Sequence, residues 1–255
     1  MTNNPAVPPE STRTTTPTTT QSTTEKVALG WTHTARFLTT ASQLVHLPAT
    51  ELPEIAFVGR SNAGKSTAIN QLAQQKRLAF ASKTPGRTQH INLFELGPKD
   101  AADCLFADLP GYGYAAVARS AKLRWQKVMA DYLEVRRSLS GLVLMVDSRL
   151  GLTELDRQLL EFVTDRIANG SVRLLVLLTK SDKLNRKEAN AVLASTQEFL
   201  SGIATEESEI VVTLFSALKK QGVGDVALVL HGWTRRTAAD ADAADATATP
   251  AVLSE

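Results

Sequence analysis

Eight consecutive residues have the types and spacing needed to hold a chain of phosphates. They fit the pattern G-x-x-x-x-G-K-[ST] and are, in order, Gly59, Arg60, Ser61, Asn62, Ala63, Gly64, Lys65 and Ser66. An apolar run over 54–58 precedes them, and a helix-like run over 67–73 follows. In such a strand–turn–helix setting, backbone N–H groups face an anion at the positive end of the helix dipole. The pattern predicts a nucleotide site in which Lys65 reaches the β- and γ-phosphates and Ser66 binds Mg²⁺.

A second motif predicts which base the nucleotide carries. It consists of Thr179, Lys180, Ser181 and Asp182 and follows the apolar run 174–178, so it should end a buried strand. Open α/β sheets bind ligands at that edge. The Asp182 carboxylate can accept both the ring N–H and the exocyclic amine of guanine, whereas adenine presents the opposite pattern. The motif therefore favours GTP and GDP, with the stem of Lys180 lying along the base.

A third motif, made of Asp108, Leu109, Pro110 and Gly111, predicts contacts with the metal and the terminal phosphate. It follows a strand-like run over 103–107. We expect Asp108 to hold the Mg²⁺ shell and the Gly111 N–H to meet the γ-phosphate, because glycine permits close approach. The loop after Gly111 should then respond to the presence of the γ-phosphate.

Two threonines in the segment 83–89 are candidates for a further Mg²⁺ ligand. Thr84 precedes a proline and is typical of a turn. Thr88 follows a Pro-Gly pair and leads into a predicted strand over 90–95, so a loop carrying it can order or melt. We assign the ligand to Thr88. A weaker motif after the strand-like run 210–215 predicts contacts with the guanine carbonyl, and its residues are Phe215, Ser216 and Ala217.

Together these motifs resemble those of the EngB family, also called YihA or YsxC, of bacterial ribosome-assembly GTPases. The resemblance covers roughly residues 35–235, and its most specific part is the Pro-Gly-Tyr-Gly-Tyr run at 110–114. It implies a cytoplasmic GTP-hydrolysing switch that uses Mg²⁺, binds the large ribosomal subunit and ribosomal RNA, and supports normal cell division and septation. It also implies that the nucleotide is lined by Gly86, Arg87, Gln89 and His90.

Catalysis is assigned to Lys65, Thr88, Gly111 and Asn62. Many GTPases carry a glutamine after the glycine of the third motif to orient the attacking water, but this chain has Tyr112 there. A phenol is a poor substitute, so we expect slow intrinsic hydrolysis that is activated by the ribosome, by potassium, or by both. Related GTPases use an asparagine at the position of Asn62 to hold K⁺ against the phosphates.

The alternation of strand and helix patterns predicts an α/β fold. We expect a doubly wound, mostly parallel, six-stranded sheet with helices on both faces, the P-loop GTPase fold, and one antiparallel strand. The predicted strands lie near 55–58, 90–95, 103–107, 142–147, 173–178 and 210–215, and helices follow 64, 119, 153, 186 and 222. The segment 35–39 is a weaker candidate for an edge element.

Composition divides the chain into three parts. We predict a GTPase domain over 29–236, a disordered Thr/Pro-rich tail over 1–28 and a disordered, acidic, Ala-rich tail over 237–255. The formal net charge is +2, and because the last tail is acidic the basic excess lies in the domain, where it is permissive for RNA. No apolar run approaches the roughly 20 residues needed to span a bilayer. The single cysteine, Cys104, fits a buried strand, and we expect a monomer.

Two other functions remain open from the residues. One is a P-loop phosphotransferase acting on a small metabolite, and the other is a GTP-bound scaffold that does not hydrolyse its nucleotide. Asp182 and the lack of an obvious acceptor-site motif count against the first.

Overall fold

The computed structural model describes residues 18–79, 90–113 and 119–234, without the side chains of 18–22 and 119–126. A seven-stranded sheet lies at the centre, in the order β1-β3-β4-β2-β5-β6-β7. The strands are β1 (Arg36–Ala41), β2 (Glu54–Gly59), β3 (Ile91–Leu96), β4 (Cys104–Asp108), β5 (Leu139–Asp147), β6 (Arg173–Thr179) and β7 (Ile210–Leu214). The helices are α1 (Thr18–His33), α2 (Lys65–Leu72), α3 (Arg119–Val135), α4 (Glu154–Ala168) and α5 (Arg186–Ser201), with short 3₁₀ turns η1 (Leu44–His46) and η2 (Ser181–Lys183). Residues 223–234 form a further helix, here called the terminal helix.

The direction of the strands confirms the predicted fold class. Strand β2 runs parallel to β4 and β5, and the parallel ladder continues through β6 to β7. Only β3 is reversed among the described strands, because it pairs antiparallel with both β4 and β1. The sheet has seven strands rather than the six predicted, since the weak edge candidate near 35–39 forms β1. The short, partly polar sequence of β1 is a weak strand signal, and its backbone hydrogen bonds come from pairing with β3.

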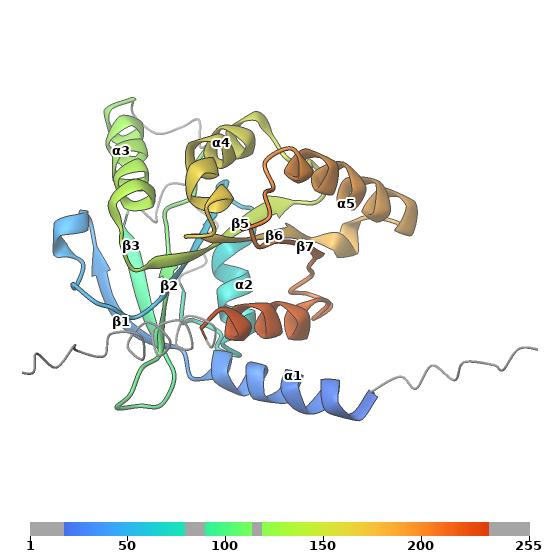
Figure 1. Ribbon diagram of the computed structural model, residues 1–255, viewed down its shortest axis with the longest axis horizontal. Helices are drawn as coiled ribbons and strands as arrows, with labels where there is room; N and C mark the ends of the chain where they lie inside the picture. Colours follow the sequence, from blue (N-terminus) through green and yellow to red (C-terminus); the bar gives the residue numbers. More distant parts are fainter. Residues whose placement is uncertain (1–17, 80–89, 114–118, 235–255) are drawn as a thin grey trace, which may run out of the picture.

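Helices cover both faces of the sheet (Figure 1). Helices α3, α4 and α5 pack on one face, and α1, α2 and the terminal helix pack on the other. Residues of β2 therefore alternate between two cores: Ala56 and Val58 belong to the first, and Ile55 and Phe57 to the second. Burial on both faces is why the central strands read as continuous apolar runs.

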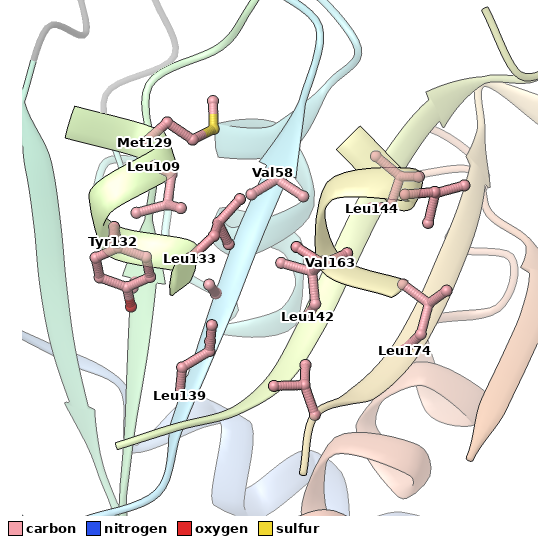
Figure 2. Close-up of a cluster of buried hydrophobic side chains, with 14 of the residues drawn as sticks. Val58, Leu109, Met129, Tyr132, Leu133, Leu139, Leu142, Leu144, Val163 and Leu174 are labelled. Carbon is pink, nitrogen blue, oxygen red and sulfur yellow. The ribbon is translucent and has the colours of Figure 1, made fainter. Parts of the chain in front are cut away.

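Figure 2 shows part of the first core, in which helix side chains meet the sheet. Leu133 of α3 and Val163 of α4 lie over the strand residues Val58, Leu142 and Leu174. This packing holds α3 and α4 against the sheet, in which β2 leads into the phosphate-binding turn.

The N-terminal tail predicted for 1–28 is wrong for residues 18–28, which form most of α1. Ala28 is fully buried, Trp31 is nearly so, and the Trp31 indole donates a hydrogen bond of 2.9 Å to Asp103. The sequence of this segment is mostly polar, and its helix depends on these few contacts with the second core. The rest of that tail and the tail predicted for 237–255 lie outside the described residues.

Two buried groups complete the framework. Cys104 packs inside β4, and burial, followed by the nearby charges of Asp103 and Glu54, raises the pKa of its thiol. Glu54, at the start of β2, is fully buried and accepts hydrogen bonds from the Tyr132 hydroxyl and from Arg136 at 2.8 Å. This network fastens the end of α3 to the sheet.

None of the helices within the described ranges is long and apolar enough to cross a membrane.

Candidate nucleotide-binding site

The turn from β2 to α2 has a backbone that requires glycine at two positions. A Cβ on Gly59 would lie 2.6 Å from the Met145 carbonyl oxygen, and Gly64 has φ of 97°. Gly64 is also the N-cap of α2 and has no side chain to satisfy the first N–H groups of the helix. Those N–H groups point toward the turn, where a bound anion can accept their hydrogen bonds. The predicted P-loop therefore has the local geometry of a phosphate cradle.

A buried ion pair connects the P-loop to the third motif. The Lys65 ammonium contacts Asp108 Oδ1, and both side chains are almost completely buried. Asp108 Oδ2 is buried as well and has no hydrogen-bond partner among the described residues. An unsatisfied buried carboxylate oxygen is costly. Ser66 follows Lys65 in the first turn of α2 and carries a hydroxyl oxygen, and Mg²⁺ prefers oxygen ligands. The residues present thus fit the metal.

The segment after Asp108 lies directly against the P-loop. A Cβ on Gly111 would come within 3.1 Å of both the Cα and the backbone N of Ser61, so a larger residue would push the two loops apart. The Ser61 N–H donates to the Tyr112 carbonyl at 2.8 Å, and the Tyr112 N–H donates to the Gly59 carbonyl at 3.1 Å. Leu109 is buried in the first core and anchors this segment.

The segment predicted to carry Thr88 lies outside the described residues, as do Gly86, Arg87 and Gln89. The assignment of Thr88 over Thr84 stays a prediction. His90 is described, and its side chain is exposed directly before β3.

The motif Thr179–Asp182, here called the base-reading motif, lies at the end of β6, as predicted, and contacts the P-loop. The Thr179 hydroxyl is buried and lies 2.7 Å from the Ala63 carbonyl oxygen. Lys180 adopts a left-handed backbone with φ of 56°, and its ammonium donates to the Asn62 carbonyl at 2.7 Å. These contacts lock the base-reading loop to the phosphate-binding turn.

Asp182 is held by the last motif. The Ser216 hydroxyl donates to Asp182 Oδ1 at 2.6 Å and accepts from the Lys219 N–H at 3.1 Å. The hydrogen bond from Ser216 lowers the pKa of Asp182, so the carboxylate is ionised and oriented. The Ser181 N–H donates to the Phe215 carbonyl at 3.2 Å, which brings the two motifs side by side.

Sequence reasoning missed one residue of this site, Asp147 at the end of β5. Its Oδ2 accepts from Lys180 Nζ at 2.8 Å and from Arg149 at 2.6 Å. Burial raises the pKa of Asp147, but the hydrogen bonds from Arg149 and Lys180 outweigh burial and hold it well below the usual value. The sequence did contain a signal for it: Asp147 ends the strand-like run 142–147, just as Asp108 directly follows the run 103–107. A hollow of about 180 Å³ adjoins Asp147 and the P-loop.

The fold and this site define a P-loop protein of the guanine-nucleotide-binding class. The family model of 50S ribosome-binding GTPases matches residues 54–180. A probable GTP-binding protein EngB from Acidovorax ebreus is 62% identical over 205 residues, which cover 80% of this chain and 90% of that relative. The EngB relative from Albidiferax ferrireducens is 59% identical over 207 residues, with coverage of 81% and 96%. The chain belongs to the EngB family of GTP-binding proteins.

A solved structure agrees with the fold. The crystal structure of a probable GTP-binding protein engB covers 72% of this chain and 99% of its own, with a TM-score of 0.51 and 22% identity. The family resemblance read from the motifs is confirmed.

Proposed function

We propose that this protein is a GTP-hydrolysing switch that assists assembly of the large ribosomal subunit. One observation carries the proposal: the P-loop, the Asp108–Gly111 segment and the Thr179–Asp182 loop converge at the carboxyl ends of β2, β4 and β6. That edge is where doubly wound sheets bind their ligands. The three motifs supply, respectively, a phosphate cradle, a γ-phosphate contact and a guanine acceptor.

Each residue has a distinct task in this proposal. Lys65 exchanges its contact with Asp108 for the β- and γ-phosphates, where its charge opposes theirs. Ser66, Thr88 and Asp108 would hold Mg²⁺, directly or through water, and the bound ion would neutralise phosphate charge. The Gly111 N–H donates to the γ-phosphate and reports its presence, while Asp182 accepts the two donors of guanine.

The ribosomal partner is proposed from the family and from charge. The matching family model is described as a 50S ribosome-binding GTPase, and the domain between the tails carries the basic excess expected for contact with ribosomal RNA. The GTP form docks on the immature large subunit in the cytoplasm, and hydrolysis releases it. Normal cell division and septation then depend on this assembly step.

Slow intrinsic hydrolysis follows from the orientation of Tyr112. Its hydroxyl donates to Asp156 in α4 at 2.5 Å, so it does not orient an attacking water. Asn62 is exposed at the tip of the P-loop, with φ of 67°, and its side-chain oxygen can help hold K⁺ there. A cation that neutralises transition-state charge adds about 10³–10⁵ in rate when it acts as an arginine finger does.

The potassium part of the proposal is tested by single-turnover hydrolysis in matched sodium and potassium buffers. We expect faster hydrolysis in potassium, and loss of the difference in Asn62→Ala. Equal rates in both salts would reject K⁺ and leave the ribosome as the activator.

The whole proposal is tested by GTP turnover with and without purified large ribosomal subunits, with Lys65→Ala as the inactive control. We expect slow release of inorganic phosphate that the subunits accelerate. Transfer of the γ-phosphate to a small molecule would instead identify a phosphotransferase. Tight GTP binding without phosphate release under either condition would identify a scaffold.

A further inference from the structure

The side chain of Tyr112 makes a contact that the proposed reaction does not explain. Tyr112 directly follows Gly111, yet its ring packs in the first core and is only 5% exposed. Its hydroxyl donates to Asp156 Oδ1 in the first turn of α4, 44 residues further along the chain. Asp156 is 1% exposed, and its Oδ2 accepts from the Thr153 N–H at 2.8 Å and hydroxyl at 2.6 Å. The carboxylate is therefore fixed by the cap of α4 and fixes the tyrosine in turn.

The backbone of Tyr112 is held from the other side by the P-loop. It exchanges hydrogen bonds with Gly59 and Ser61, as described above, and a Cβ added to the neighbouring Gly111 would lie 3.1 Å from Ser61. The next residue, Gly113, has φ of 77°, a conformation that frees the chain to change direction. Two separate elements thus hold Tyr112, and the peptide that carries the Gly111 N–H is adjacent to both attachments.

The Tyr112–Asp156 hydrogen bond is of the strong, charge-assisted kind. Burial, followed by the charge of Asp156, raises the pKa of Tyr112 far above its usual value, so the phenol keeps its proton and stays a donor. Packing alone would need only the ring, because phenylalanine fills nearly the same volume in a core of Leu109 and its neighbours. The hydroxyl is the part that ties the segment to α4.

We propose that Tyr112 is a positioning residue for recognition of the γ-phosphate. The Tyr112–Asp156 hydrogen bond holds the Gly111 N–H in place at the P-loop, so that binding GTP does not have to order this peptide. GDP has no γ-phosphate and does not use the Gly111 contact. The bond therefore contributes to GTP affinity and not to GDP affinity, and it makes the discrimination between them depend on α4. The inference rests on the proposed function of this site.

The test compares two identical substitutions, Tyr112→Phe and Tyr132→Phe. Both remove a buried phenol hydroxyl that donates to a buried carboxylate, but Tyr132 pairs with Glu54 at the opposite end of β2 from the P-loop. Affinities for fluorescent GDP and for a non-hydrolysable GTP analogue are measured by titration. We expect Tyr112→Phe to weaken binding of the GTP analogue about tenfold and to change the affinity for GDP by no more than about twofold. Tyr132→Phe should leave the ratio of the two affinities unchanged.

Asp156→Asn is the second variant. It keeps an oxygen acceptor for the phenol and removes the charge, so the affinity ratio should shift in the same direction by a smaller factor. An unchanged ratio in a folded Tyr112→Phe protein, or equal weakening of both nucleotides, would overturn the inference while the proposed function stands. Failure of the parent protein to bind either nucleotide would reject the proposed function itself, and the inference with it.

Discussion

Three aspartates lie at or just beyond the carboxyl ends of β4, β5 and β6, and each has a different partner. Asp108 at the end of β4 contacts Lys65, Asp147 at the end of β5 contacts Lys180 and Arg149, and Asp182, shortly after β6, accepts from Ser216. Position at the edge of the sheet brings all of them to the nucleotide site. In the proposed function, these surroundings assign Asp108 to the metal, Asp147 to Lys180 and Asp182 to the guanine.

The first prediction concerns the base. Asp182→Asn should weaken GTP and GDP binding by about tenfold or more and improve binding of xanthine nucleotides. The carboxylate accepts two guanine donors, whereas an amide can donate to the extra carbonyl of xanthine. Fluorescent-nucleotide titration measures both effects. Unchanged GTP affinity would show that Asp182 does not read the base.

The second prediction concerns Asp147. Asp147→Asn should weaken GTP and GDP equally, by about tenfold, because it removes the charge that holds the Lys180 ammonium beside Asn62. The lowered pKa means that the native contact is complete above the unfolded value of about 3.9 and is lost as pH falls through the folded pKa. The defect of the variant should therefore be constant from about pH 6 to pH 8.

Asp165→Asn, on the exposed side of α4, is the matched control for Asp147→Asn and should leave both affinities unchanged. A defect of the Asp147 variant confined to GTP would contradict its role at Lys180 and would place it at the γ-phosphate instead.

At the scale of elements, α3 is attached to the sheet at the end away from the nucleotide. The buried Glu54 carboxylate joins the start of β2 to Tyr132 and Arg136 near the end of α3, and Arg166 of α4 donates to the Leu133 carbonyl at 2.7 Å. This end of α3 is therefore fixed to the sheet and to α4.

The third prediction follows from that attachment. Tyr132→Phe should lower the free energy of unfolding by about 1–3 kcal/mol, since it leaves a buried carboxylate oxygen with fewer donors. Burial, then the charge of Glu54, raises the pKa of Tyr132, so the phenol donates over the whole working range of pH. Denaturant unfolding measures the change, with the exposed substitution Phe162→Leu as a control expected to stay within about 0.5 kcal/mol. A loss no larger than that of the control would show that Tyr132 acts by packing alone.

At the scale of the whole molecule, both faces of the sheet are covered by helices, so the sheet faces themselves are closed to a large partner (Figure 1). Helix α3 is the next helix after Gly111 in the chain and carries several basic residues in its sequence. The Lys127 side chain is 76% exposed, and its pair with Asp131 at 3.3 Å is a surface contact of little strength. In the proposed function, this charge is one that would contact RNA phosphates.

The fourth prediction tests this surface. Reversing Lys122 and Lys127 to Glu should weaken co-sedimentation with large ribosomal subunits and leave GTP affinity unchanged. The dependence of binding on salt should become shallower as well, because fewer counterions are released. Arg186→Glu with Lys187→Glu makes the same change of charge on exposed positions of α5 and is the control. Equal losses in both double variants would indicate a general charge effect rather than a contact through α3.

The nucleotide motifs and the succession of strands and helices followed from the sequence, because both depend on local rules. Glycines at 59, 64 and 111 mark places where the backbone is left-handed or closely approached, and apolar runs of strand length mark a sheet buried on both faces. The fold class and the family were therefore accessible from residues that are neighbours in the chain.

Tertiary structure alone decided the rest. The polar segment 18–28 becomes helical because Ala28 and Trp31 find a core, and β1 becomes a strand because β3 pairs with it. The bonds from Asp147 to Lys180 and from Tyr112 to Asp156 join residues 33 and 44 positions apart. A carboxylate's charge is visible in a sequence, but its partner is chosen by which elements the sheet order places side by side, and no local pattern contains that order.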